Sequence, residues 1–217
     1  MNITNFFQKY NISLDSFQIE LFEKFLILFL EKNSQINLSA IRDWLWVIEK
    51  HFIDSIILNH FIKLSWNILD IGTGWGFPGI PLAITNPNCN FTLLDSTRKK
   101  IEAVNEFSQK LGLKNCSWVW WRAEELSSNP EYKKQFDFVV SRATAYLPQI
   151  IERSLPFLKK WWKLVFYKIF DEKEIADWEQ ILHKNWMKIT EIFKYKIWEQ
   201  ERIFLITWLF NNNYLTN

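Results

Sequence analysis

The chain has 217 residues, of which 48% are hydrophobic and 23% charged, with a formal net charge of +2. This length suits one main domain with a single core, and the composition excludes a disordered or fibrous protein. The low net charge excludes a general polyanion binder, so any nucleic-acid surface must come from local clusters of Lys and Arg. The two cysteines lie outside any CxxC spacing. We therefore expect a cytoplasmic protein without a disulfide framework or a metal site.

The first part of the chain is predicted to be helical. Apolar residues recur at helical spacing over residues 13–33 and about 43–63. The most apolar run, residues 22–32, is far shorter than the roughly 20 residues that a membrane-spanning helix needs. We expect residues 1–64 to form a helical segment packed on the core, and residues 65–217 to form the main domain.

After this segment the hydrophobic period changes. Short apolar runs rich in Val, Ile, Leu and Phe occupy 67–71, 90–95, 116–121, 136–141 and 163–169, with helical stretches between them. Such alternation predicts βαβ units, and so an α/β fold with a doubly wound, mostly parallel, Rossmann-like sheet. Near the C-terminus, residues 202–210 predict a final strand that pairs with residues 187–195.

A glycine-rich loop follows the first predicted strand, in the stretch NILDIGTGWGFPGIPL. Gly74, Gly76 and Gly79 satisfy the dinucleotide-loop pattern G-x-G-x-x-G, which a plain strand-to-helix turn explains equally well. Asp95 ends the next strand, where an acid accepts hydrogen bonds from the ribose hydroxyls of a nucleoside. The loop and this acid together predict a site for an adenosine-containing cofactor.

Asp70 bears on the choice of cofactor, because it ends the first strand just before the glycines. A carboxylate there opposes a pyrophosphate and favours a cation or an amino group. S-adenosylmethionine carries both a sulfonium and an α-ammonium. The sequence therefore favours S-adenosylmethionine as the cofactor.

Several motifs then resemble one family in order and spacing. They are DIGTGWGFPGIPLA, FTLLDSTRKK, WRAEEL, VVSRATAYLP and LVFYK, with NLSAIRD and KHFIDSIIL upstream. Over roughly residues 20–208 the chain resembles the bacterial 16S rRNA guanine-N7 methyltransferases known as RsmG or GidB. The resemblance implies transfer of a methyl group from S-adenosylmethionine to a guanine N7 in the 530 loop of 16S rRNA, within the small ribosomal subunit or its precursor.

Carried over position by position, the resemblance implies that Gly72 and Phe77 line the methionine and sulfonium end of the cofactor. It implies that Ala123 and Glu124 contact the adenine, and that Arg142 reaches the cofactor. We add Gly74, Gly76 and Asp95 from the chemistry of the loop and the ribose. We expect a monomer that needs no metal and does not bind a membrane.

The implied methyl transfer requires little proton transfer by the protein. Guanine N7 has a free lone pair and no proton, so positioning and exclusion of water matter more than a general base. Arg142 is a candidate contact to guanine O6 or a phosphate, or else a structural ion-pair partner. His51 is either a packed structural histidine or a contact to RNA. Basic residues at 96–100 and 158–160 are candidate contacts to the RNA backbone.

Two other classes of function stay open. A nicotinamide-dependent oxidoreductase would use the same sheet and Asp95, although no second catalytic domain or proton donor is evident. A non-catalytic ribosome-associated or RNA-binding module would bind small subunits without methyl transfer. Binding of a dinucleotide, or binding of subunits without transfer, would separate these classes from the methyltransferase.

The chain contains 13 Trp and only 5 Gly, against an average glycine usage of about 7%. Tryptophans stand where a turn or a ligand loop favours glycine, and we single out Trp46, Trp66, Trp75, Trp121, Trp161 and Trp162. One hypothesis is that a codon written here as Trp is read as Gly by the source organism. The other is that the protein is Trp-rich. In the first case the printed chain would fold and still be inactive, because Trp75 would fill space meant for the cofactor.

Overall fold

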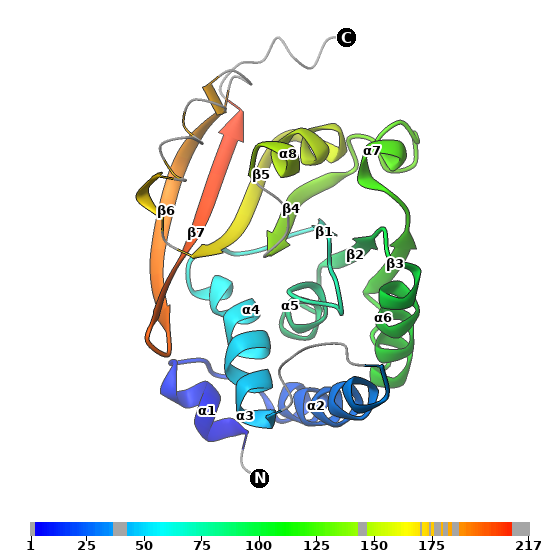
Figure 1. Ribbon diagram of the computed structural model, residues 1–217, viewed down its shortest axis with the longest axis vertical. Coiled ribbons are helices and arrows are strands. Elements are labelled where there is room, and N and C mark those ends of the chain that lie inside the picture. Colours follow the sequence, from blue (N-terminus) through cyan, green and yellow to red (C-terminus); the bar gives the residue numbers. More distant parts are fainter. Residues whose placement is uncertain are drawn as a thin grey trace.

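A computed structural model gives the architecture of the chain (Figure 1). The structure describes residues 3–36, 43–142, 147–169, 171–173, 175, 179, 182–183 and 187–209. The helices are α1 (Thr4–Lys9), α2 (Ser16–Ile36), α3 (Trp44–Val47), α4 (Asp54–Ile56), α5 (Gly79–Thr85), α6 (Arg98–Leu111), α7 (Ala123–Leu126) and α8 (Leu147–Ser154). A π-helical segment, Ile48–Ile53, joins α3 to α4, and 3₁₀ turns span Ile57–His60 and Leu155–Phe157.

The strands form one sheet in the order β3-β2-β1-β4-β5-β7-β6. Their bounds are β1 (Asn67–Ile71), β2 (Asn90–Asp95), β3 (Cys116–Trp120), β4 (Phe136–Arg142), β5 (Leu158–Ile169), β6 (Met187–Ile197) and β7 (Gln200–Leu209). The first five strands pair in parallel, and β7 is antiparallel to both β5 and β6. The predicted doubly wound, mostly parallel sheet is confirmed, and so is the pairing of the last two segments.

The fifth strand differs from its prediction at its start. It begins at Leu158 rather than at residue 163, and its register with β4 is irregular. Phe136 pairs with Leu158 and Phe138 with Lys163, so residues 159–162 bulge against the single residue Asp137. We expected Trp161 and Trp162 in a helix-to-strand turn, and the structure instead places their backbone in this bulge.

The N-terminal helices lie on the same side of the sheet as α5 and α6, and α2 packs against both of these (Figure 1). Phe22, Phe25 and Phe29 follow the spacing of one helical face of α2, and all three are fully buried. The Phe25 ring packs against Phe52 before the sheet, at a centroid distance of 5.2 Å, and against Phe77 after β1, at 5.5 Å. This shared core joins the helical segment to the sheet, and the division into residues 1–64 and 65–217 stays a prediction.

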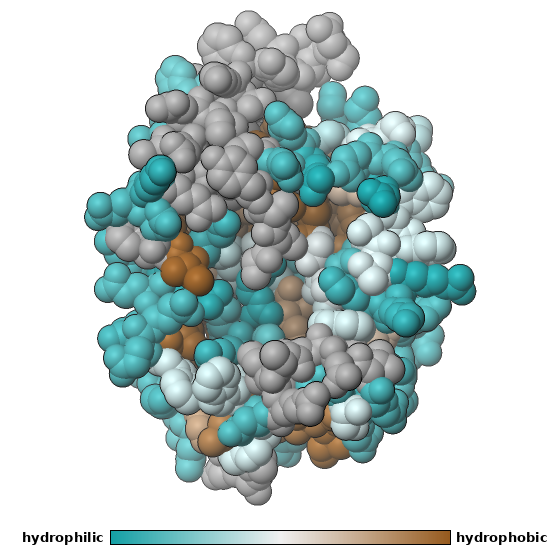
Figure 2. Space-filling view, in the orientation of Figure 1, coloured by the Kyte–Doolittle hydropathy of each residue, from teal (hydrophilic) through white to brown (hydrophobic). Residues whose placement is uncertain are grey.

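The visible face in Figure 2 is mostly hydrophilic, with apolar residues in small separate patches. Among the helices described, none is long and apolar enough to cross a membrane.

Candidate cofactor site

A cavity of about 270 Å³ lies at the carboxyl ends of β1, β2 and β3. The strand order reverses beside β1, which has β2 on one side and β4 on the other, and ligands of open α/β sheets bind at such a switch point. The cavity is lined by Ile71, Gly72, Leu94, Asp95, Ser96, Thr97, Lys100, Trp121, Arg122, Ala123, Glu124, Ile150 and Arg153.

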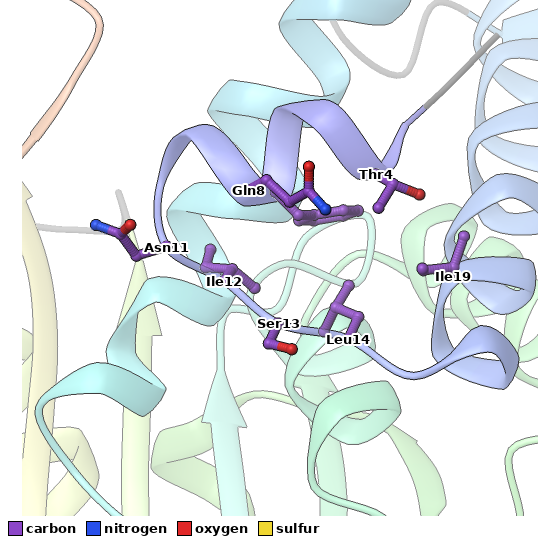
Figure 3. A pocket seen from close by; sticks show the side chains of 8 residues that line it. Thr4, Gln8, Asn11, Ile12, Ser13, Leu14 and Ile19 are labelled. Carbon is purple, nitrogen blue, oxygen red and sulfur yellow. The ribbon is translucent and has the colours of Figure 1, made fainter.

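A second hollow, of about 300 Å³, lies between α1 and the start of α2 (Figure 3). Its lining side chains are apolar or neutral, among them Phe7, Gln8 and Leu14. It is remote from the carboxyl ends of the strands and offers no charged group to a cationic or ribose-bearing ligand. The cavity at the strand ends is therefore the better cofactor site.

Asp95 organises the loop that borders this cavity. Its Oδ2 accepts a hydrogen bond from the Gly74 amide at 2.9 Å, and its Oδ1 accepts one from the Thr97 amide at 2.8 Å. The ammonium of Lys100 lies 3.8 Å from Oδ2. Two carboxylate oxygens offer about four acceptor positions, so Asp95 still has capacity for ribose hydroxyls.

The loop itself leaves its backbone open to a ligand. Gly72 and Gly74 have φ values of +71° and +60°, a conformation that side chains disfavour. The Gly72 and Thr73 amides donate to the Leu94 carbonyl at 2.8 and 3.0 Å, which holds the loop against β2. A Cβ atom built on Gly74 would meet nothing within 4 Å. This open space beside the backbone suits the close approach of a cofactor.

The structure brings together only part of the predicted set. Gly72, Asp95, Ala123 and Glu124 line the cavity, and Gly74 joins them through its bond to Asp95. Gly76, Phe77 and Arg142 are not among the lining residues. Phe77 is buried, and its ring packs on Phe25 and on His51.

Three basic lining residues were not predicted to be at the cofactor site: Lys100, Arg122 and Arg153. Arg153 forms an ion pair with Glu124, so it orients the carboxylate that the resemblance places at the adenine. The basic run at 96–100 was the only sequence signal for Lys100, and we had interpreted it as an RNA contact. Arg153 comes from α8, far along the chain, and no local pattern indicates it.

Asp70 has a different role from the predicted one. It is fully buried, and its Oδ2 accepts a hydrogen bond from the Gly79 amide at 2.9 Å, so it caps α5. Burial raises the pKa of its carboxyl from 3.8 to about 7, while the Gly79 amide opposes that rise. A carboxyl that is half protonated near neutral pH attracts a cation only weakly. The expected attraction of Asp70 for a cation therefore does not follow from its charge alone.

The turn from β1 into α5 needs glycine at position 79. A Cβ atom there would lie 2.1 Å from Leu93 Cδ2 and 2.8 Å from Asp70 Oδ2. Only a residue without a side chain lets α5 pack this closely on β2 and receive the Asp70 cap. The glycine pattern in this loop thus serves helix packing as well as ligand access.

Arg142, at the end of β4, belongs to a buried polar cluster. Its Nη1 lies 3.2 Å from Asp54 Oδ2 and also donates to the Ser55 hydroxyl at 3.2 Å. Arg202 Nε lies 3.0 Å from Asp54 Oδ1, and the Tyr195 hydroxyl donates to the same oxygen at 2.9 Å. Asp54 thus connects the helical segment to β4, β6 and β7.

His51 connects this cluster to the glycine loop. Its ring stacks on Phe77 at a centroid distance of 4.6 Å, and its Nδ1 lies 3.3 Å from Arg142 Nη2. Because Arg has only donors, Nδ1 accepts and the proton of neutral His51 is on Nε2. Burial, with the Arg142 charge, lowers the pKa of His51 to about 3. The interpretation of His51 as a packed histidine agrees with these contacts.

The tryptophans that were candidates for misread glycine codons lie in different structural surroundings. Trp121 lines the cavity and is half exposed. Trp75 is not among the residues that line the cavity and packs against the core, and its overlap with the cofactor stays a prediction. Trp46 lies inside α3 and has no unusual backbone conformation.

The lining residues fit S-adenosylmethionine. Asp95 has acceptor capacity for ribose, Glu124 is held in place by Arg153, and the backbone at Gly72 and Gly74 is open. No cluster of three or more His, Cys, Asp or Glu that could hold a metal ion occurs in the part of the chain that the structure describes.

Solved structures share this fold. A methyltransferase of Aquifex aeolicus that depends on S-adenosylmethionine matches with a TM-score of 0.58 and 16% identity, over 82% of this chain and 97% of that chain. A precorrin-6y C5,15-methyltransferase of Geobacter metallireducens matches with a TM-score of 0.55 and 17% identity, over 70% of this chain and 85% of that chain. At these identities the likeness shows the fold alone.

Sequence comparisons show closer relatives. Two are named ribosomal RNA small subunit methyltransferase G. That of Lachnoclostridium phytofermentans is 42% identical over 77% of this chain and 71% of its own length. That of Leuconostoc citreum is 37% identical over 86% of this chain and 80% of its own length. The sequence profile of the GidB family, rRNA small subunit methyltransferase G, matches residues 18–201. The chain therefore belongs to the rRNA small subunit methyltransferase G family and has the fold of S-adenosylmethionine-dependent methyltransferases.

Proposed function

We propose that the protein transfers the methyl group of S-adenosylmethionine to N7 of one guanine in the 530 loop of 16S rRNA. Family membership supports an rRNA substrate, and the cavity at the strand ends supports the cofactor. The observation that carries the proposal is the Asp95-held glycine loop beside this cavity. In this proposal the protein acts as a cytoplasmic monomer on the small subunit or its precursor.

When it is bound, the cofactor supplies an electrophilic methyl group, and the protein holds the cofactor and the guanine in position. Asp95 holds the ribose, while Ala123 and Glu124 border the adenine. Guanine N7 attacks with a lone pair and loses no proton, so no general base is required. His51 stays neutral near neutral pH, since its pKa is about 3. A neutral side chain does not repel the positive charge that methylation places on the guanine.

In this proposal Arg142 is a positioning residue that holds neighbouring side chains in place. Its Nη1 is occupied by Asp54, Ser55 and the Lys50 carbonyl, and its side chain is 8% exposed. It holds His51 and, 5.3 Å from its guanidinium carbon, the Phe77 ring. We therefore propose that Arg142 fixes the positions of His51 and Phe77 beside the glycine loop.

The two candidate RNA contacts differ in location. Residues 98–100 begin α6, next to the cavity, and Lys100 is one of its lining residues. Lys159 forms an ion pair with Asp137, which accepts from the amide of Asn67 at the first residue of β1. That pair lies at the amino ends of the strands, opposite the cofactor. The start of α6 is the better surface for RNA phosphates.

The proposal is tested with labelled S-adenosylmethionine and small ribosomal subunits that lack guanine-N7 methylation. The printed chain is used beside a variant with glycine at positions 75, 121, 161 and 162. We expect label on a single guanine N7 in the 530 loop, and none on subunits that already carry the modification. Label on another nucleotide contradicts the proposed target. Subunit binding without transfer by either chain favours the non-catalytic module instead.

A further inference from the structure

Four residues other than glycine have a positive φ in the described part of the chain: Asn11, Trp66, Lys134 and Trp198. Asn enters this left-handed region more readily than most residues, whereas a bulky residue there is an outlier. Two of the four are tryptophans, each with a φ of +57°. The backbone at these two positions has the conformation that glycine adopts without strain.

Trp66 immediately precedes β1. Its carbonyl accepts a hydrogen bond from the Asn90 amide at 2.7 Å, which fixes the backbone where β1 and β2 begin to pair. Its side chain is 69% exposed, so little packing compensates the strained backbone. Position 66 therefore requires a backbone with positive φ, while its exposed indole contributes little packing.

Trp198 is the first of two residues that join β6 to β7. The register pairs Ile197 with Gln200, so Trp198 and Glu199 form a two-residue hairpin loop. Such loops require a positive φ at their first position, and Gly, Asn or Asp usually occupy it. Trp198 is 43% exposed and meets the edge of the Trp46 ring at 5.3 Å.

At three further tryptophans, features other than the backbone φ favour glycine, namely a place in the cavity lining or in a strand bulge. Trp121 is the largest side chain that lines the cofactor cavity, where it takes up space beside Asp95 and Ala123. Trp161 and Trp162 lie in the bulge of β5, and glycine is frequent at such bulges. Trp44, by contrast, starts α3 with an ordinary backbone and packs against Phe6 at 5.7 Å.

We infer that the protein made by its source organism carries glycine at positions 66, 121, 161, 162 and 198, where the printed sequence has tryptophan. A codon translated here as Trp and read as Gly in the source explains the backbone at 66 and 198, the bulky side chain in the cavity and the bulge together. It also explains why the chain has 13 Trp and 5 Gly. Position 198 carries no sequence signal of its own, because its need for glycine comes from the hairpin register.

Mass spectrometry of the native protein tests the inference directly. Trypsin cleavage after Lys196 and Arg202 releases a peptide of residues 197–202, and cleavage after Lys63 and Arg98 releases one of residues 64–98. We expect the mass and fragment ions of glycine at 198 in the first peptide and at 66 in the second. Tryptophan at either position overturns the inference. This readout does not involve RNA, so it is independent of the proposed methyl transfer.

Thermal unfolding of the recombinant chain gives a second test. At positions 66 and 198, Gly should give a Tm about 2–4 °C above both Trp and Ala, because only glycine relieves the positive φ. At Trp44, the matched control in a helix, Ala should give a higher Tm than Gly. An Ala variant as stable as the Gly variant at 66 and 198 contradicts the inference.

The affinity for S-adenosylmethionine tests whether position 121 carries glycine. This test rests on the proposed function, in which S-adenosylmethionine is the ligand of the cavity. By calorimetry, Trp121→Gly should bind S-adenosylmethionine at least tenfold more tightly than the printed chain. Trp66→Gly is the control, because Trp66 is exposed, precedes β1 at the amino ends of the strands and does not line the cavity. Unchanged affinity in Trp121→Gly contradicts the assignment of glycine to that position.

Discussion

Individual buried polar residues determine much of the hydrogen bonding around the candidate cofactor site. Asp70 is one residue before the end of β1 and Asp95 ends the adjacent β2, yet the first is enclosed and caps α5 whereas the second borders the cofactor cavity. The difference arises because the Asp70 carboxyl points to the N-terminus of α5, while that of Asp95 accepts amides from loops on both sides. Two similar sequence signals thus have different roles.

The buried Asp70 carboxyl should make stability depend on pH. Its folded pKa is about 7 against 3.8 for the exposed group. Between those values the folded protein holds a proton that the unfolded chain has lost, so unfolding releases it and stability falls as pH rises. We expect a loss on the order of 4 kcal/mol across this window, with no further loss from this group above it.

Urea unfolding at several pH values checks this expectation. Asp70→Asn should remove the fall in stability between about pH 4 and pH 7. The control Asp43→Asn, at an exposed helix cap, should leave it unchanged. A slope that persists in Asp70→Asn would show that another group causes it.

At the scale of elements, the cluster around Asp54 holds the helical segment on the sheet. Asp54 is 1% exposed and lies within 3.2 Å of Arg142 from β4 and within 3.0 Å of Arg202 from β7. The Tyr167 hydroxyl on β5 donates to the Ser55 carbonyl at 2.7 Å. The segment that carries His51 is therefore fixed by side chains from four strands.

Loss of the Asp54 charge should leave the largely enclosed Arg142 and Arg202 without their buried counter-charge. We expect Asp54→Asn to lower the free energy of unfolding by about 3–5 kcal/mol, as for other broken buried ion pairs. Urea denaturation measures this change. The matched control is Glu102→Gln, which breaks an exposed i,i+4 pair with Arg98 and should cost less than about 0.5 kcal/mol. A loss in Asp54→Asn as small as that of the control would contradict the role of the cluster.

At the scale of the whole molecule, the cofactor site depends on loops at one edge of the sheet. The cavity takes residues from the ends of three strands and from α8, which are far apart in the chain. Its geometry therefore requires the complete fold, and a ligand that binds there should stabilise the whole protein.

S-adenosylmethionine at a hundred times its Kd should raise the free energy of unfolding by about 2.7 kcal/mol, seen as a higher Tm. Asp95→Asn should weaken binding at least tenfold, because the amide offers fewer acceptors to ribose and to Gly74. Asp137→Asn, at the opposite end of the sheet, should bind the cofactor normally. Equal affinity in the two variants would remove Asp95 from the site.

The sequence by itself determined the order of the elements, the parallel sheet and the glycine loop beside the candidate cofactor cavity. These depend on local signals: hydrophobic periods, glycines after a strand and an acid at the end of the next. The burial of Asp70, the pairing of Arg142 with Asp54 and the place of Arg153 in the cavity were decided only by the tertiary structure. Each depends on which residues distant in the chain come into contact, and no local pattern in the sequence encodes that.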